Sequence, residues 1–184
     1  MRKMTMSFTL YEIDNAPSPA NTELEKSQAA FGFIPNLHKV LAASPKTLEA
    51  YKALHELFQA SSFDATEQTV VWQTINFYHQ CHYCLPAHTG IAHMMKVDQE
   101  TIESLHNGET LKTEKLKALQ STTRAIVDQR GVLSAEQITD FKSAGYGEAQ
   151  LLEIVLGLAQ KTISNFANHL AKTPVDEPFK KFVK

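Results

Sequence analysis

The chain has 184 residues, of which 43% are hydrophobic and 21% charged, a composition typical of a folded globular domain. A formal charge of -2 and an isoelectric point near 6.4 give no electrostatic preference for nucleic acid or for anionic membranes. No segment resembles a signal peptide or a transmembrane helix, so we expect a cytoplasmic protein without nucleic-acid or membrane partners.

Helical periodicity runs along almost the whole chain, and alternating strand patterns are nearly absent. Helix start signals accompany it, among them Ser44 before Pro45, a capping-box pattern of Asp64 and Glu67, and Ser134. In chain order the expected helices lie within 21–32, 34–44, 44–61, 64–80, 81–97, 98–108, 112–131, 134–145 and 147–173, and an irregular tail follows at 175–184.

These segments predict an all-α helical bundle of about eight or nine helices. We expect one domain over residues 1–184, with a core motif at 64–97 and an N-terminal extension at 1–20. The last helix is apolar almost all round from 151 to 158, which is typical of the centre of a core or of a subunit interface. Aromatic residues at helical spacing are expected in the core, namely Phe33, Trp72, Phe77, Phe141 and Phe166.

Both cysteines lie in the stretch HQCHYCLPAHTG, residues 79–90, together with three histidines. On an ideal helix Cys81, Cys84 and His88 would line one stripe. Cys84 and His88 are spaced i,i+4, close enough for the imidazole to take the thiol proton. A thiolate is the reactive form of cysteine, and a thiol three residues away can close a disulfide with it. This combination suits reduction of a peroxide or exchange with a disulfide.

Pro86 complicates an uninterrupted helix, because it has no N–H and its ring clashes with the preceding turn. We therefore expect the helix to begin near Cys84, with Pro86 in its first turn. Free backbone amides and the positive end of the helix then favour a thiolate. This arrangement supports redox chemistry and weakens the one-stripe geometry.

Three other interpretations of the cysteine pair remain. A structural zinc site would need a fourth ligand from His79, His82 or His93, since the chain has no second cysteine pair. A thioredoxin-type site would need a strand before its helix, and that pattern is missing. The third is a pair of buried, unreactive thiols. We expect no metal and no cofactor.

The segment EQTVVWQTINFYHQCHYCLPAHTGIAH resembles the core of the alkylhydroperoxidase D (AhpD)-like branch of the carboxymuconolactone decarboxylase superfamily. Its signature is a glutamate, a helix and then C-x-x-C-x-x-x-H. The flanks FGFIPNLHKVLAASPKTLEAYKAL and ISNFANHLAKTPVDEPF resemble the entry and closing segments of peroxidase-related members. The resemblance spans most of the chain. It implies an all-α fold, assembly into dimers, trimers or hexamers, and thiol peroxidase activity without haem or metal.

The resemblance also assigns roles. Cys84 matches the peroxide-reacting thiol, Cys81 the resolving thiol and His88 the base, although the residues alone leave open which cysteine reacts first. Glu67 would polarise the base through water. It stands two residues farther from the first cysteine than in the best-studied members, so the chain would have to turn near His79 for any contact. A purely capping role for Glu67 is the alternative.

Two further histidines draw attention. His79 is a candidate substitute in a proton relay, and a solvated position at a helix end is its simpler interpretation. His169 also matches a family position, and we expect a structural role for it.

The expected function is a thiol-dependent (alkyl) hydroperoxide reductase in antioxidant defence, re-reduced by an external thiol or dithiol such as a lipoyl group or a thioredoxin-like partner. One alternative is an acid–base enzyme like carboxymuconolactone decarboxylase, using His88 and Glu67 without thiols. Another is a non-catalytic oligomeric protein that senses oxidation through the cysteine pair.

Overall fold

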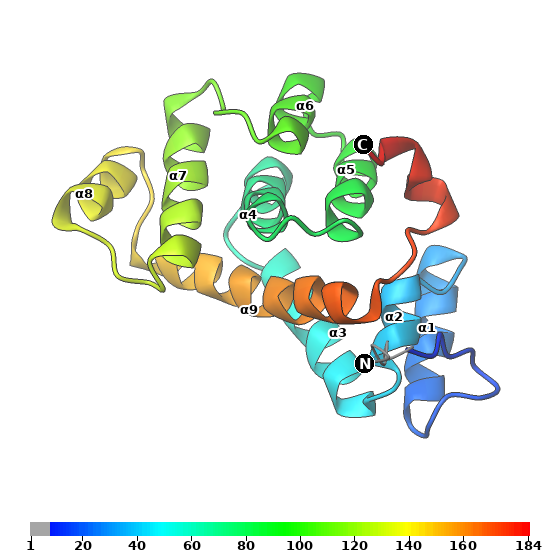
Figure 1. The fold of residues 1–184 in the computed structure, drawn as a ribbon. Coiled ribbons are helices and arrows are strands. Elements are labelled where there is room, and N and C mark those ends of the chain that lie inside the picture. The colour runs from blue at the N-terminus through cyan, green and yellow to red at the C-terminus, as the bar shows by residue number, and fades with distance from the viewer. Residues whose placement is uncertain (1–7) are drawn as a thin grey trace, which may run out of the picture.

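A computed structural model describes residues 8–184. Within these residues there is no β-strand, and the predicted all-α fold is confirmed (Figure 1). The elements are α1 (Ala20–Phe31), α2 (Asn36–Leu41), α3 (Pro45–Gln59), α4 (Ala65–Tyr78), α5 (Cys84–Met94), α6 (Gln99–Asn107), α7 (Glu114–Asp128), α8 (Ala135–Ser143), α9 (Glu148–Ala171) and the short 3₁₀ helix η1 (Glu177–Phe182). The helix η1 lies in the tail that was predicted to be irregular.

Helix ends follow the local chemistry of the sequence. Ser44 precedes α3 with Pro45 at its first position, where the missing N–H costs nothing. At α4 the Asp64 carboxylate accepts from the N–H of Glu67 at 2.8 Å, and the Glu67 carboxylate accepts from the N–H of Asp64 at 3.0 Å. This is the predicted capping box. Pro86 occupies the first turn of α5, as its lack of an N–H requires.

The helices pack around α4, which lies between α7 and α5, while α9 runs across this group and packs against α3 and α4 (Figure 1). The helix η1 returns to pack on α5. Ten consecutive residues of α4, from 67 to 76, are buried. The segments that carry the cysteines and their neighbours therefore sit at the middle of the bundle.

Only some of the aromatic residues predicted to lie in the core are buried. Trp72 and Phe141 are buried and Phe33 is half-buried, but Phe77 and Phe166 are 41% and 50% exposed, so their predicted core positions are wrong. Phe77 lies in the last turn of α4, near its solvent end, and Phe166 lies on the outer side of α9. Helical spacing indicates a shared face, and it does not say whether another element covers that face.

Helix α9 is covered on one side only. At its inner side Gly157 lets α3 approach closely, since a Cβ there would come within 2.8 Å of the Phe58 ring. On its outer side Leu152 is 71% exposed and Val155 is 48% exposed. The apolar stretch 151–158 thus faces both the core and the solvent.

The predicted N-terminal extension is only partly described, because its residues 1–7 lie outside the described part of the chain. Beyond them Tyr11 donates its N–H to the carbonyl of Lys39 at 3.2 Å, and Tyr11 and Ile13 pack against the cluster of hydrophobic side chains that contains both cysteines. Among residues 8–184, no helix has the length and hydrophobicity needed to cross a bilayer.

Candidate functional site

The cysteines lie where the chain leaves α4 and enters α5. Gln80 adopts a left-handed backbone conformation with φ of 52°, and the N–H of Cys81 donates to the carbonyl of Asn76 at 3.0 Å. The turn expected near residue 79 is therefore present. Cys81 directly follows this turn, and Cys84 is the first residue of α5.

The two cysteines are free thiols and contact each other. The N–H of Cys84 donates to Sγ of Cys81 at 3.3 Å, and the two side chains are hydrogen-bonded. From α9, Nδ2 of Asn168 donates to Sγ of Cys84 at 3.2 Å. Cys81 and Cys84 are only 1% and 2% exposed. The two thiols are close together and shielded from solvent.

The surroundings distinguish the two thiols. Burial by itself raises the pKa of Cys84, but the Cys81 hydrogen bond, the charge of Lys161 and the amides of α9 outweigh it and hold that pKa well below its ordinary value. The hydrogen bond to Cys84, burial and the charge of Cys84 raise the pKa of Cys81. The surroundings therefore favour the thiolate form at Cys84 more than at Cys81.

A buried lysine, Lys161, lies near the thiols and contacts His88. Lys161 is fully buried, and its Nζ donates to Nε2 of His88 at 2.8 Å. Burial, followed by the charge of Lys161 and the neighbouring His55, lowers the pKa of His88 well below its ordinary value. His88 is thus neutral and its Nε2 contacts the lysine, and its predicted role as the base for Cys84 remains a prediction.

A row of buried polar side chains on α9 faces α4 and α5. Its members are all inaccessible to solvent and recur at intervals of three and four residues: Gln160, Lys161, Ser164, Asn165 and Asn168. Sequence reasoning missed these residues because the apolar stretch 151–158 dominated the interpretation of this helix. The missed signal was polar residues at i, i+4 and i+8 along an otherwise apolar helix.

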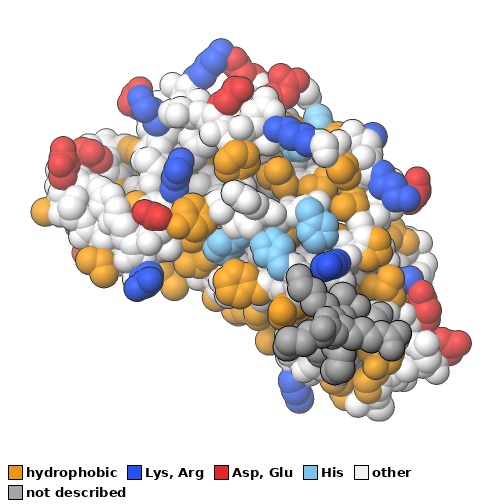
Figure 2. All heavy atoms as spheres, viewed as in Figure 1, with side chains coloured by type: hydrophobic (Ala, Val, Ile, Leu, Met, Phe, Trp, Pro, Cys, Tyr) orange, Lys and Arg blue, Asp and Glu red, His pale blue; other side chains and the backbone are white. Residues whose placement is uncertain are grey.

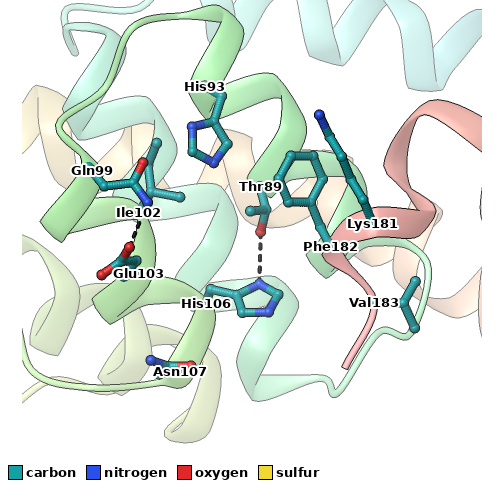
Figure 3. A pocket seen from close by; sticks show the side chains of 10 residues that line it. All are labelled: Thr89, His93, Gln99, Ile102, Glu103, His106, Asn107, Lys181, Phe182 and Val183. Atoms are coloured by element: carbon teal, nitrogen blue, oxygen red, sulfur yellow. Dashed lines mark hydrogen bonds between the residues drawn. The ribbon is translucent and has the colours of Figure 1, made fainter.

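Amide side chains extend this polar row into α4. Asn165 donates to Oδ1 of Asn76 at 2.9 Å, Asn76 donates to Oε1 of Gln73 at 3.0 Å, and Gln73 donates to Oγ1 of Thr89 at 3.0 Å. Thr89 is hydrogen-bonded to Nδ1 of His106 at 2.9 Å, and the two side chains point toward one another in the wall of a pocket of about 270 Å³ between α5, α6 and the C-terminal segment (Figure 3). A continuous path of hydrogen bonds thus joins this pocket to the surroundings of the thiols.

His79 lies on the other side of the same network. Its Nδ1 is 2.9 Å from Oδ1 of Asn165, whose amide also contributes to the lowered pKa of Cys84. His79 is half-buried, so it connects the thiolate to the surface through one amide. His169 is exposed and makes only a long contact, 3.4 Å from its Nε2 to the carbonyl of Gln80.

The structure does not bring Glu67 to the cysteines. It lies in the first turn of α4, while the thiols lie beyond the last turn of that 14-residue helix. Its carboxylate accepts from the hydroxyl of Tyr146 at 2.9 Å and pairs with Lys115 at 2.8 Å, besides closing the capping box with Asp64. Burial would raise the pKa of Glu67, but these contacts outweigh it and lower that pKa. The capping alternative is the one that the structure forms.

The histidines considered as zinc ligands are engaged elsewhere. Nε2 of His82 is 2.9 Å from the carbonyl of Thr173, and the ring of His93 stacks on Phe182 with centroids 5.3 Å apart. Within residues 8–184 no three His, Cys, Asp or Glu side chains come together as a metal-binding group. The geometry around the thiols is that of a dithiol beside a buried cation.

No protein-family model matches the chain, and no curated protein matches it. Solved structures, in contrast, do match the chain. The AhpD core of an uncharacterised peroxidase-related protein from Ralstonia eutropha JMP134 is 16% identical with a TM-score of 0.84, over 95% of this chain and 94% of that one. An uncharacterised peroxidase-related protein from Silicibacter sp. TM1040 is 16% identical with a TM-score of 0.78, over 97% of both chains.

A third match is the debrominase Bmp8, in a cysteine-to-alanine variant in complex with 2,3,4-tribromopyrrole. It is 17% identical with a TM-score of 0.79, over 97% of this chain and 96% of that one. At such identities the likeness concerns the fold. The chain has the all-α AhpD-like fold, so the resemblance drawn from its sequence to AhpD-like, peroxidase-related proteins is confirmed at that level.

Proposed function

We propose that this protein is a thiol-dependent oxidoreductase that reduces a hydroperoxide with the Cys84 thiolate and the Cys81 thiol. The observation that carries the proposal is the contact between the two thiols at the start of α5: the N–H of Cys84 donates to Sγ of Cys81, and the Asn168 amide donates to Sγ of Cys84. Lys161 and Asn168 lower the pKa of Cys84, and the pair raises the pKa of Cys81, which supports Cys84 as the attacking thiol. An attacking thiolate with an adjacent protonated thiol is what two-step peroxide reduction requires.

Cys84 and Cys81 together supply the two electrons that reduce the hydroperoxide. The Cys84 thiolate attacks the terminal oxygen of the hydroperoxide, the O–O bond breaks, and the alkoxide leaves and takes one proton from water to become the alcohol. Cys84 becomes a sulfenic acid. Cys81 then attacks the Cys84 sulfur, water leaves, and a Cys81–Cys84 disulfide forms. An external thiol or dithiol, such as a lipoyl group or a thioredoxin-like protein, returns the pair to two thiols.

Unpaired polar atoms near the thiols support a substrate position there. Oδ1 of Asn168 and Oγ1 of Thr173 are buried without a hydrogen-bond partner. The Asn168 amide already donates to Cys84 through its nitrogen. Its free oxygen can accept the O–H of a hydroperoxide next to the sulfur that attacks it, and leaving such a group unpaired costs free energy otherwise.

Access to the pair requires local opening, since both cysteines are buried and the chain after α9 packs over their cluster. His82 holds this segment through the carbonyl of Thr173. Small hydroperoxides need the least opening, so hydrogen peroxide is the reagent for the first test.

The test is mass spectrometry of the reduced protein after one equivalent of hydrogen peroxide. We expect a Cys81–Cys84 disulfide in the wild type and a sulfenic acid on Cys84, trapped by dimedone, in Cys81→Ser. Cys84→Ser should consume no peroxide. Equal consumption by Cys84→Ser, or modification of Cys81 alone, would contradict the proposal.

The same assay separates the other candidates. The similarity to a debrominase favours a second reductive reaction, in which the dithiol gives two electrons to a carbon–bromine bond and releases bromide with a disulfide. Release of bromide from 2,3,4-tribromopyrrole without peroxide turnover would favour it. Activity in the double serine variant would favour acid–base chemistry by His88, and oxidation without turnover would favour a sensor.

A further inference from the structure

A second pocket, which neither cysteine lines, lies between one face of α4 and one face of α7. It has a volume of about 440 Å³, within the range of small-molecule sites. On the face shown in Figure 2, hydrophobic side chains over α4 adjoin basic side chains over α7. Six of the lining residues give the pocket its chemical character: Thr74, Phe77 and Tyr78 of α4, Lys117 and Arg124 of α7, and Glu109 of the loop between α6 and α7.

The walls of this pocket are fixed before any ligand binds. The Phe77 ring lies against Gly108, where a Cβ would come within 2.0 Å of it. Oη of Tyr78 donates to Oδ1 of Asp128 at 2.7 Å. The Gln120 side chain holds the loop between α6 and α7 through two hydrogen bonds. Its Nε2 donates to the carbonyl of Glu109 at 2.9 Å, and its Oε1 accepts from the N–H of Leu111 at 3.1 Å. A preformed pocket avoids the ordering cost that weakens binding.

The net charge of the lining residues favours an anionic ligand. Lys117 and Arg124 contribute two positive charges and Glu109 one negative charge, which leaves a net charge of +1. Lys117 makes only a long ion pair with Glu114, at 3.6 Å. None of the ion pairs formed within residues 8–184 includes Arg124. Its guanidinium is therefore available to a single carboxylate, which it can bind through two hydrogen bonds.

The floor of the pocket carries an unsatisfied donor. Thr74 is 7% exposed and lines the pocket, and its hydroxyl has no hydrogen-bond partner. A threonine inside a helix commonly donates to a carbonyl of the preceding turn, as Thr69 does to Ala65 at 2.8 Å. Because Thr74 does not, a ligand oxygen in the pocket would complete its hydrogen bonding.

We propose that this pocket binds a small monoanionic organic carboxylate that carries an aromatic ring or a short alkyl chain. The carboxylate pairs with Arg124 and Lys117, and the apolar part packs between Phe77 and Tyr78. The net charge of +1 favours a monoanion over a dianionic phosphate. This site is separate from the dithiol, since neither cysteine lines it.

The probe is 4-phenylbutyrate, titrated into the full-length reduced protein and followed by calorimetry and by the NMR signals of the Phe77 and Tyr78 rings. We expect saturable binding with shifts at both rings. Arg124→Gln should weaken it by about tenfold or more, because a charge-assisted bidentate contact is lost. Thr74→Val, which keeps the shape, should weaken it by a smaller factor, about threefold to tenfold.

Two controls make the result decisive. Arg130→Gln removes an arginine of the same chain region that does not line the pocket, and it should leave the affinity unchanged. The neutral amide 4-phenylbutanamide should bind at least about tenfold more weakly than the acid. No ring shifts at probe concentrations on the order of 10 mM, or equal affinity in Arg124→Gln, would overturn the proposal. Neither outcome bears on thiol turnover, which is measured separately.

Discussion

A fully buried lysine needs a compensating partner, because an isolated ammonium is strongly disfavoured away from water. Burial lowers the pKa of Lys161, and the neighbouring thiols oppose that shift. Lys161 also donates to the neutral ring of His88. Both neighbours are expected if the positive charge of Lys161 compensates the negative charge of a Cys84 thiolate. In the proposed function, the positive charge that favours the thiolate comes from α9, 77 residues along the chain from Cys84.

Replacing Lys161 with methionine should raise the pKa of Cys84, since the charge that favours the thiolate is removed. With a lowered pKa the wild-type rate of oxidation by peroxide stays level above neutral pH. In Lys161→Met the rate should rise with pH up to the ordinary thiol range and fall by about tenfold or more at pH 7. Thiolate absorbance at 240 nm and the pH–rate profile measure this. Lys46→Met, at an exposed lysine of α3, is the control. An unmoved profile in Lys161→Met would remove the lysine from the mechanism.

At the scale of elements, the helices could be predicted from the sequence because their signals are local. The Asp64 capping box, the Ser44–Pro45 start and the shift of the α5 start to Cys84 by Pro86 depend on residues within one turn of each other. The contacts around the thiols could not be predicted this way. Asn168 and Lys161 reach them only through the packing of α9 on α4 and α5, which no local spacing encodes.

Replacing Glu67 tests whether this residue acts locally, at the start of α4, or through tertiary structure, at the thiols. Glu67→Ala should lower the free energy of unfolding by about 1–2 kcal/mol, because the N–H of Asp64 and the Tyr146 hydroxyl both lose their acceptor while the Asp64 cap itself remains. The rate of Cys84 oxidation should stay within about twofold of wild type, since the carboxylate lies at the opposite end of α4. Urea unfolding and stopped-flow oxidation give the two numbers.

The matched control for this variant is Glu136→Ala, which removes an exposed carboxylate from the first turn of α8, where Ser134 and Gln137 form the capping box. It should change neither quantity appreciably. If Glu67→Ala slowed thiol oxidation in a protein that remains folded, the role implied by the family resemblance would stand after all.

For the whole molecule, the outer side of α9 is an apolar surface that nothing in residues 8–184 covers. Leu152, Val155, Phe166 and Leu170 are 48% to 71% exposed, and the exposed Ala159 lies between them, four residues after Val155 and seven before Phe166. Such a stripe on a 24-residue helix is typical of helix–helix packing between subunits. The homo-oligomer implied by the resemblance remains a prediction, and this stripe is the surface that we assign to it.

The stripe is self-complementary if a second copy packs antiparallel. Leu152 then faces Leu170 of the other copy at each end, and the small Ala159 lies near the centre, where two helices approach most closely. The acidic start of α9 at Glu148 meets its basic end at Lys172, and the helix dipoles oppose each other favourably.

Charges placed on this stripe should therefore separate the subunits. Leu152→Lys combined with Leu170→Lys puts like charges face to face in the antiparallel pair, so sedimentation equilibrium should show the wild type as a dimer or a larger oligomer and the double variant as a monomer. Val132→Lys changes an equally exposed apolar residue, 74% accessible, outside α9 and should leave the assembly intact. Because the thiols lie on the inner side of α9, the dissociated variant should still form the Cys81–Cys84 disulfide. A monomeric wild type, or an unchanged oligomer in the double variant, would exclude α9 as the contact surface.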